Sequence, residues 1–144
     1  MNRILLILAL TGLATVAMAA EAPALPGTSA PAAARVYIIS PADGATVGQE
    51  FTVRFGLEGM GVAPAGVTRE HTGHHHLLVD VKTLPAAGQP IPADANHIHF
   101  GGGQTQTKLK LAPGTHTLQL ELGDANHVPF VPAVVSKKIT VHVK

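Results

Sequence analysis

The sequence predicts an all-β domain, an immunoglobulin-like antiparallel β-sandwich of about seven strands. Short segments alternate apolar and polar residues with a period of two, which is typical of half-buried strands. Gly, Pro, Asp and Asn separate these segments at regular intervals and indicate turns. No segment beyond residue 19 has the apolar spacing of an amphipathic helix. A small closed barrel is the alternative architecture.

Residues 1–19 are predicted to be a secretory signal peptide. Arg3 gives the short positive start, residues 4–16 form the apolar core, and Ala17-Met18-Ala19 fits the small-x-small cleavage rule. The apolar run is too short for a stop-transfer helix. We therefore expect a periplasmic or secreted protein with no membrane attachment after cleavage.

The remaining chain divides into an Ala/Pro-rich linker at residues 20–34 and one folded domain at residues 35–144. The absence of cysteine excludes disulfides and thiolate metal sites, so the domain needs a substantial hydrophobic core. It also lacks the Cys–Trp–Cys hallmark of antibody domains, so the expected likeness is one of architecture. A net charge of +1 argues against nucleic-acid binding, which needs a basic face.

Seven segments are expected to form strands in chain order: residues 36–39, 51–57, 74–81, 97–100, 107–111, 117–122 and 139–143. Glycine-rich residues 59–66 and proline-rich residues 84–94 are expected to be loops. Pro113-Gly114 predicts the type II turn of a hairpin. The alternation predicts a core made of Phe51, Val53, Phe55, Leu77, Val79, Leu109, Leu118, Leu120, Ile139 and Val141.

Histidine carries most of the chemistry that the sequence offers, and five of the nine histidines fall in residues 72–81 and 96–103. Alternate side chains of a strand point to opposite faces. His75 therefore shares the apolar face of Leu77 and is expected in the core or at its rim. His74 and His76 are expected to face outward, about 6.5–7 Å apart along the strand. His97 and His99 form a second pair of this kind.

Five motifs resemble a known bacterial family. They are GLEGMGVAPAG at residues 56–66, TGHHHLLVD at 72–80, PIPAD at 90–94, HIHFG at 97–101 and PGTHTLQL at 113–120. Together they are similar to the domain-of-unknown-function family numbered 4399, over about residues 36–143. The resemblance implies a small exported domain and carries over no established activity.

The functional hypothesis is a first-row metal site, copper first and zinc next, because imidazole suits both ions. Four histidines are the expected ligands: His74, His76, His97 and His99. Three further side chains are held in reserve, since His71 or His127 could replace a ligand and the Met60 thioether would favour copper. Asp80 is expected to orient a ligand histidine through its second ring nitrogen.

Other histidines have simpler interpretations. His116 has the parity of the leucines at 118, 120 and 122 and is expected in the core with a backbone hydrogen bond, and His142 is expected on the surface. Residues 94–98 and 124–128 repeat the pattern Asp-Ala-Asn-His-apolar. Either both segments share one turn chemistry, or both present a histidine to one site.

Three function classes remain open from the sequence. The first is metal storage, delivery or sensing without turnover, because no second catalytic group is evident. The second is an interaction module whose histidines form a buried polar network. The third is a metal-dependent redox enzyme. Dismutase-like sites of this kind accompany a disulfide that this chain lacks, and amino-terminal-histidine copper oxygenases need a mature chain that begins with histidine, whereas cleavage here leaves Ala20 or Glu21.

Overall fold

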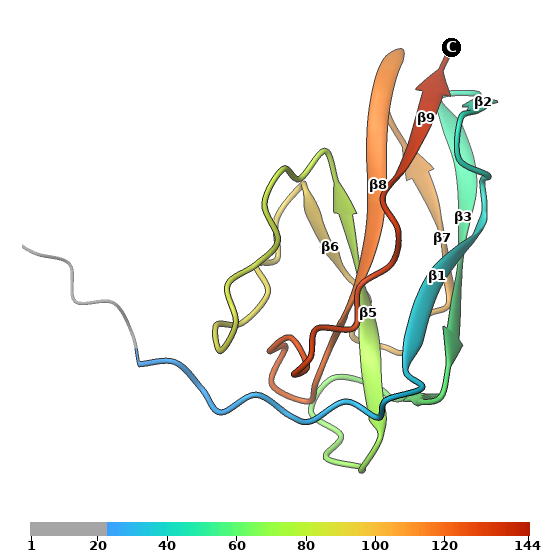
Figure 1. The fold of residues 1–144 in the computed structure, drawn as a ribbon. Helices are drawn as coiled ribbons and strands as arrows, with labels where there is room; N and C mark the ends of the chain where they lie inside the picture. The colour runs from blue at the N-terminus through green and yellow to red at the C-terminus, as the bar shows by residue number, and fades with distance from the viewer. Residues whose placement is uncertain (1–22) are drawn as a thin grey trace, which may run out of the picture.

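The structure is a computed structural model that describes residues 23–144. The predicted signal peptide lies outside the described residues. Within residues 23–144 all regular structure is β-strand and there is no helix, so the all-β prediction is confirmed (Figure 1). It follows that this part of the chain has no helix that could span a membrane. In chain order the strands are β1 (Arg35–Ser40), β2 (Ala45–Val47), β3 (Glu50–Glu58), β4 (Gly61–Val62), β5 (Thr72–Val79), β6 (His97–His99), β7 (Gln106–Lys110), β8 (Gly114–Gly123) and β9 (Ile139–Val143).

The strands form two sheets. One has the order β1-β3-β7, and the other has the order β2-β9-β8-β5-β4, with β6 paired to β5 as well. Neighbouring strands are antiparallel except for β2 with β9 and β4 with β5, which are parallel. Strand β5 is therefore bordered by β8 along one edge and by β4 and β6 along the other.

One hydrophobic core joins the two sheets. Val53 and Phe55 of β3 pack in the same cluster as Leu77 of β5 and Leu120 of β8. Every residue of the predicted core is buried except Phe51, which is half-buried against the cluster. His75 is fully buried, with its ring 5.2 Å from that of Phe55, so its predicted place in the core is confirmed.

Two local predictions are wrong. Pro113-Gly114 does not close a hairpin, because β7 pairs with β3 in one sheet while β8 pairs with β5 and β9 in the other. The turn therefore carries the chain between sheets, with Gly114 at φ 143°. The loop at residues 59–66 contains the short strand β4, whose residues pair with the start of β5.

The outward face of β5 is not exposed to solvent, contrary to the sequence prediction. His74 and His76 have exposed fractions of 0% and 1%. The turn at residues 124–128 and the long connection from β5 to β6 lie on this side of the sheet (Figure 1). The two are joined by a hydrogen bond from the Ile91 N–H to the His127 carbonyl, 2.8 Å. The histidine pair is thus enclosed by segments remote in sequence.

The segment predicted as a linker makes several hydrogen bonds to the domain. The Ala30 N–H donates to the Val131 carbonyl at 3.0 Å, and the Val131 N–H donates to the Thr28 carbonyl at 2.8 Å. The Thr28 hydroxyl donates to Asp124 Oδ2 at 2.6 Å. Residues 28–30 therefore lie along the loop that carries His127.

Candidate metal centre

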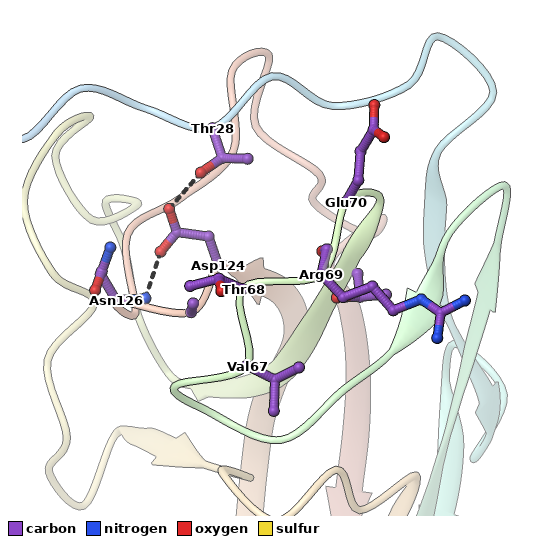
Figure 2. A pocket seen from close by; sticks show the side chains of 9 residues that line it. Thr28, Val67, Thr68, Arg69, Glu70, Asp124 and Asn126 are labelled. Atoms are coloured by element: carbon purple, nitrogen blue, oxygen red, sulfur yellow. Dashed lines mark hydrogen bonds between the residues drawn. The ribbon is translucent and has the colours of Figure 1, made fainter.

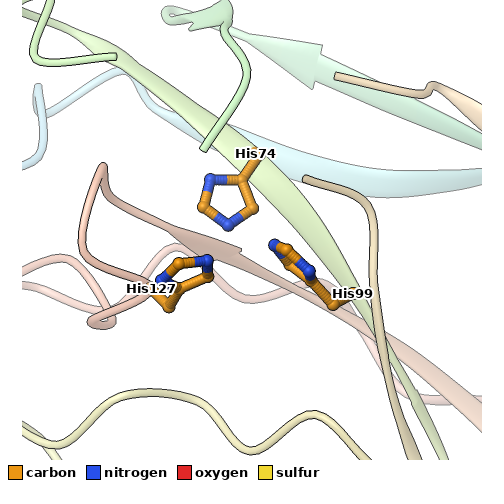
Figure 3. Close-up of side chains that lie close together, drawn as sticks. All are labelled: His74, His99 and His127. Carbon is orange, nitrogen blue, oxygen red and sulfur yellow. The ribbon is translucent and has the colours of Figure 1, made fainter. Parts of the chain in front are cut away.

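Four imidazole rings meet beside β5. His74 and His76 come from β5, His99 from β6, and His127 from the loop after β8. The ring centroids of His74, His99 and His127 are 4.7–5.1 Å apart. One ring nitrogen from each of these three lies within 4.8 Å of the others, and Figure 3 shows the rings turned toward a common point. We call the four residues the histidine cluster.

His76 is the fourth member of the histidine cluster and lies at its edge. Its ring centroid is 4.8 Å from that of His74 and 5.1 Å from that of His99, but 6.3 Å from that of His127. His76 and His99 are directly opposed in the β5–β6 register, which places them on one face of the sheet. Strand alternation places His74 on that face as well.

Two glycines leave room for these rings. A Cβ atom added to Gly123 would lie 2.7 Å from Cε1 of His76, closer than real Cβ contacts. A Cβ atom added to Gly101 would overlap the ring of His99. Gly123 at the end of β8 and Gly101 after β6 are therefore explained by the space that the cluster needs.

A hydrogen-bonded turn holds His127 in place. Asp124 Oδ1 accepts the N–H groups of Asn126, 2.8 Å, and Val128, 3.0 Å. Thr28 holds the other carboxylate oxygen (Figure 2). His127 has φ 66°, in the left-handed region that few non-glycine residues adopt. The turn, and not local preference, therefore fixes the direction of this ring.

His74 and His76 are neutral and unpaired at neutral pH. Neither ring nitrogen of His74 or His76 has a hydrogen-bond partner among the described residues, nor has Nε2 of His99. Burial, with the neighbouring imidazoles, lowers the pKa of His74 to about 4 and that of His76 to about 3. Burial and His127 also lower the pKa of His99, which is partly exposed. Because a buried polar group without a partner costs about 1–3 kcal/mol, this arrangement is unfavourable unless something binds the nitrogens.

Glu121 is a functional candidate that the sequence did not single out. It lies opposite His76 in the β5–β8 register, is 1% exposed, and has no partner for Oε2. Burial raises the pKa of its carboxyl to about 7. Alternation alone places it among the polar residues of β8, as for Gln119. The register of β5 with β8 is the signal that places it beside His76, and register is set by tertiary structure.

The structure does not bring His97 to the cluster. Its Nδ1 lies 2.9 Å from Asp94 Oδ1, the same oxygen that accepts the N–H groups of His97 and Asn96. No ring contact links it to the four clustered rings within residues 23–144. Three of the predicted ligands, His74, His76 and His99, are therefore brought together, and the reserve residue His127 joins them.

The repeated Asp-Ala-Asn-His segments share their turn chemistry. In each, the first aspartate accepts the N–H of the asparagine two residues later at 2.8 Å. Their histidines differ, because His97 turns back to Asp94 whereas His127 points into the cluster. The two segments therefore share one turn chemistry, but only the second, through His127, brings its histidine to the cluster.

The remaining candidates lie elsewhere. Asp80 does not orient a clustered histidine, because its Oδ2 pairs with Nδ1 of His116 at 2.7 Å. The other nitrogen of His116 lies 2.9 Å from the Ala112 carbonyl, which is the predicted backbone hydrogen bond. His71 is exposed beside Glu70, and Met60 packs against the hydrophobic core.

A cavity of about 320 Å³ lies on the outer side of the 124–128 turn (Figure 2). Thr28, Arg69, Glu70 and Asn126 are among its lining residues, and none of the clustered histidines is. This cavity is therefore separate from the histidine cluster.

The family model of a domain of unknown function (DUF4399) matches residues 53–144. The chain belongs to this family. The DUF4399 match runs from within β3 through β9, so it includes the whole histidine cluster and Glu121. No curated protein and no solved structure matches the chain. The family description assigns no activity, and the function has to be argued from the geometry.

Proposed function

We propose that this DUF4399 domain is a non-catalytic metal-binding protein that holds one first-row transition ion in the histidine cluster. One observation carries the proposal: imidazoles from three separate segments converge, while both ring nitrogens of the buried His74 and His76 and Nε2 of His99 lack hydrogen-bond partners among the described residues. Such groups are normally paired in native proteins. An ion held by His74, His99 and His127, with His76 beside them, would supply the missing interaction.

The spacing supports this proposal. Zinc binds imidazole nitrogen at about 2.0–2.1 Å, so ligand nitrogens around a tetrahedral ion are roughly 3.3 Å apart. The ligand nitrogens of His74, His99 and His127 lie within 4.8 Å of one another. Small side-chain rotations would close the difference without a change in the strands.

The protonation state also favours metal binding. Ligation requires neutral imidazole, and the lowered pKa values of His74 and His76 keep both rings neutral well below pH 7. Copper is placed first because Cu(II) heads the Irving–Williams order for nitrogen sites, and zinc follows as an ion with the same ligand preference.

The setting that we propose is the periplasm or the outside of the cell. The charged start, apolar core and cleavage pattern of residues 1–19 support export. We further propose an immunoglobulin-like sandwich as the finer description of the fold, which the single core between the two sheets favours. The role would be storage, delivery or sensing of the ion.

The two alternative functions make different demands on the histidine cluster. A structural network in an interaction module would satisfy its ring nitrogens with hydrogen bonds, whereas those of His74 and His76 have none. A metal-dependent redox enzyme would use the same ligands as our proposal. Turnover by the metal-loaded protein would distinguish that enzyme from a storage or delivery protein.

Calorimetric titration of the exported protein with Cu(II), Cu(I) and Zn(II) tests the proposal. We expect one ion per chain at micromolar affinity or tighter, which corresponds to roughly −8 kcal/mol. The double variant His99→Ala/His127→Ala should weaken binding at least about 100-fold, near 3 kcal/mol. The matched control is His97→Ala/His142→Ala, which removes two histidines outside the cluster. Millimolar binding by the wild type, or equal losses in both double variants, would refute the site.

A further inference from the structure

We infer that Glu121 is the carboxylate partner of this centre, that it acts through His76, and that the centre therefore prefers divalent ions to Cu(I). This inference rests on the proposed function, since it concerns the ion that the histidine cluster would hold. It makes Glu121 a positioning residue and His76 the ligand that it orients.

The strand register supplies the first argument. His99 of β6 pairs with His76 of β5, and His76 pairs with Glu121 of β8. The three residues form one row across three strands, with His76 in the middle. Directly opposed residues share a face and have Cβ atoms about 4.5–5.5 Å apart. The row therefore places an imidazole on one side of His76 and a carboxyl on the other.

Burial supplies the second argument. His76 and Glu121 are each 1% exposed, and both nitrogens of His76 and Oε2 of Glu121 lack a partner. The other acids near histidines have defined roles: Asp94 pairs with His97, and Asp80 pairs with His116. Asp124 uses both oxygens to hold the 124–128 turn. Among the described residues, Glu121 is the buried acid with a carboxylate oxygen left over.

The chemistry connects these two observations. A histidine that binds a metal through one nitrogen usually donates its other ring N–H to a carboxylate or carbonyl, which fixes the ring and raises its basicity. With one nitrogen of His76 toward His74 and His99, the other can donate to Glu121. The arrangement is then metal, His76 and Glu121 in sequence, and Glu121 does not touch the ion.

Charge supplies the preference among ions. The other two residues of the row, His76 and His99, are imidazoles with lowered pKa values, so Glu121 is the acid in its row. A buried carboxylate needs a nearby positive charge, and a divalent ion interacts with it about twice as strongly as a monovalent ion at the same distance. The cluster also includes no thioether or thiolate, the soft ligands that suit Cu(I). Zn(II) and Cu(II) should therefore depend on Glu121 more than Cu(I) does.

The test compares two single variants with the wild type by titration with Zn(II), Cu(II) and Cu(I). Glu121→Gln keeps the shape and removes the charge. Glu58→Gln is the matched control, because Glu58 is an exposed acid paired with Arg35 outside the cluster. We expect Glu121→Gln to weaken Zn(II) and Cu(II) binding about 10–100-fold and to leave Cu(I) binding almost unchanged. Glu58→Gln should match the wild type for all three ions.

Two further measurements separate this role from a general structural one. In a His76→Ala background, Glu121→Gln should cause no further loss, because coupled residues are not additive. Glu121→Asp keeps the charge and should retain the preference for divalent ions. Circular dichroism checks that each variant is folded.

The inference is overturned if Glu121→Gln binds divalent ions as the wild type does, or weakens Cu(I) equally. Additive losses in the His76→Ala background would also overturn it. In these cases the wild type still binds metal, so the proposed function survives. A wild type that binds none of the three ions would overturn both.

Discussion

Seven of the nine histidines fall into two groups whose environments can be compared directly. The outer group, His97, His116 and His142, has a polar side-chain partner at each position: Asp94, Asp80 and Thr115 respectively. The histidine cluster lies against one face of β5, and the ring nitrogens of His74 and His76 have no such partner among the described residues. The comparison teaches that what sets the cluster apart is the convergence of rings from three segments, with no hydrogen-bond partner for either nitrogen of His74 and His76.

The two groups also differ in their acid–base behaviour. The hydrogen bond that the His116 ring donates to Asp80 raises the pKa of His116, whereas burial lowers the pKa values of His74 and His76. A raised pKa favours the cation and a stable ion pair. A lowered pKa leaves a neutral ring with an available lone pair, which is the state that a metal ion requires.

Acid sensitivity is the largest expected difference. The pKa of His74 and of His75 is about 4, and that of His76 about 3, against 6.5 in the unfolded chain. As pH falls from 6.5 to 4, the unfolded chain binds protons that the folded chain excludes, so the free energy of unfolding falls. Each ring accounts for about 3 kcal/mol at most. Glu121 opposes this between pH 4.5 and 7, because its folded carboxyl keeps a proton that the unfolded chain releases.

The effect of the three rings is larger than the opposing effect of one carboxyl. The free energy of unfolding of the metal-free domain should therefore fall by on the order of 5 kcal/mol between pH 6.5 and 4. Urea unfolding at a series of pH values measures this loss. The variant His116→Gln is the comparison from the outer group. The stabilisation by His116 is fully present below pH 6.5 and is lost as pH rises through its raised pKa. The free energy of unfolding of this variant should therefore still fall between pH 6.5 and 4, as in the wild type. A free energy of unfolding independent of pH would contradict the account.

Metal affinity is the next largest effect. His127→Ala should weaken Zn(II) and Cu(II) binding about 100-fold, roughly 2.7 kcal/mol, because it removes one of the three converging ligands. His97→Ala should change the affinity less than about threefold, under 1 kcal/mol. Competition titration with a chelator measures both variants. A larger loss for His97→Ala would show that the two Asp-Ala-Asn-His turns exchange roles in solution.

Substitution of a histidine by leucine should change the stability of the metal-free domain in opposite directions in the two groups. His74→Leu removes an unpaired buried imidazole and should stabilise the metal-free domain by about 1–2 kcal/mol. His116→Leu removes hydrogen bonds to Asp80 and Ala112 and should destabilise it by a similar amount, about 1–2 kcal/mol. Denaturant unfolding at pH 7.5 gives both values. Destabilisation by both variants would mean that His74 has stabilising contacts in its metal-free state.

The smallest effect is expected at His142. Its ring is exposed and its contact is with the Thr115 hydroxyl at 3.2 Å. His142→Ala should change the free energy of unfolding by no more than about 0.5 kcal/mol and should leave metal binding unchanged. A thermal melt with and without Zn(II) checks both points. A reduced metal-induced shift would place His142 in the site after all.

The sequence predicts what depends on local alternation. Period two places Val53, Phe55 and Leu120 in the core, puts His75 with them, and sets His74 and His76 together on the other face. It cannot predict that this face is covered, because the covering turn at residues 124–128 is some fifty residues away along the chain. Solvent exposure of a sheet face is a property of the tertiary structure.

Two ligand assignments show the same limit. Residues 94–98 and 124–128 are nearly identical as sequence, so nothing local indicates that His127 and not His97 reaches the cluster. The difference comes from where β6 and the loop after β8 lie relative to β5. Glu121 looks like any polar residue of an alternating strand until the register places it opposite His76.

Anomalous scattering from crystals grown with Zn(II) tests the central claim most directly. The account predicts one strong zinc peak surrounded by ring nitrogens of His74, His99 and His127, with His76 next to it. A peak at the Asp94–His97 or Asp80–His116 pair, with none at the histidine cluster, would contradict the account.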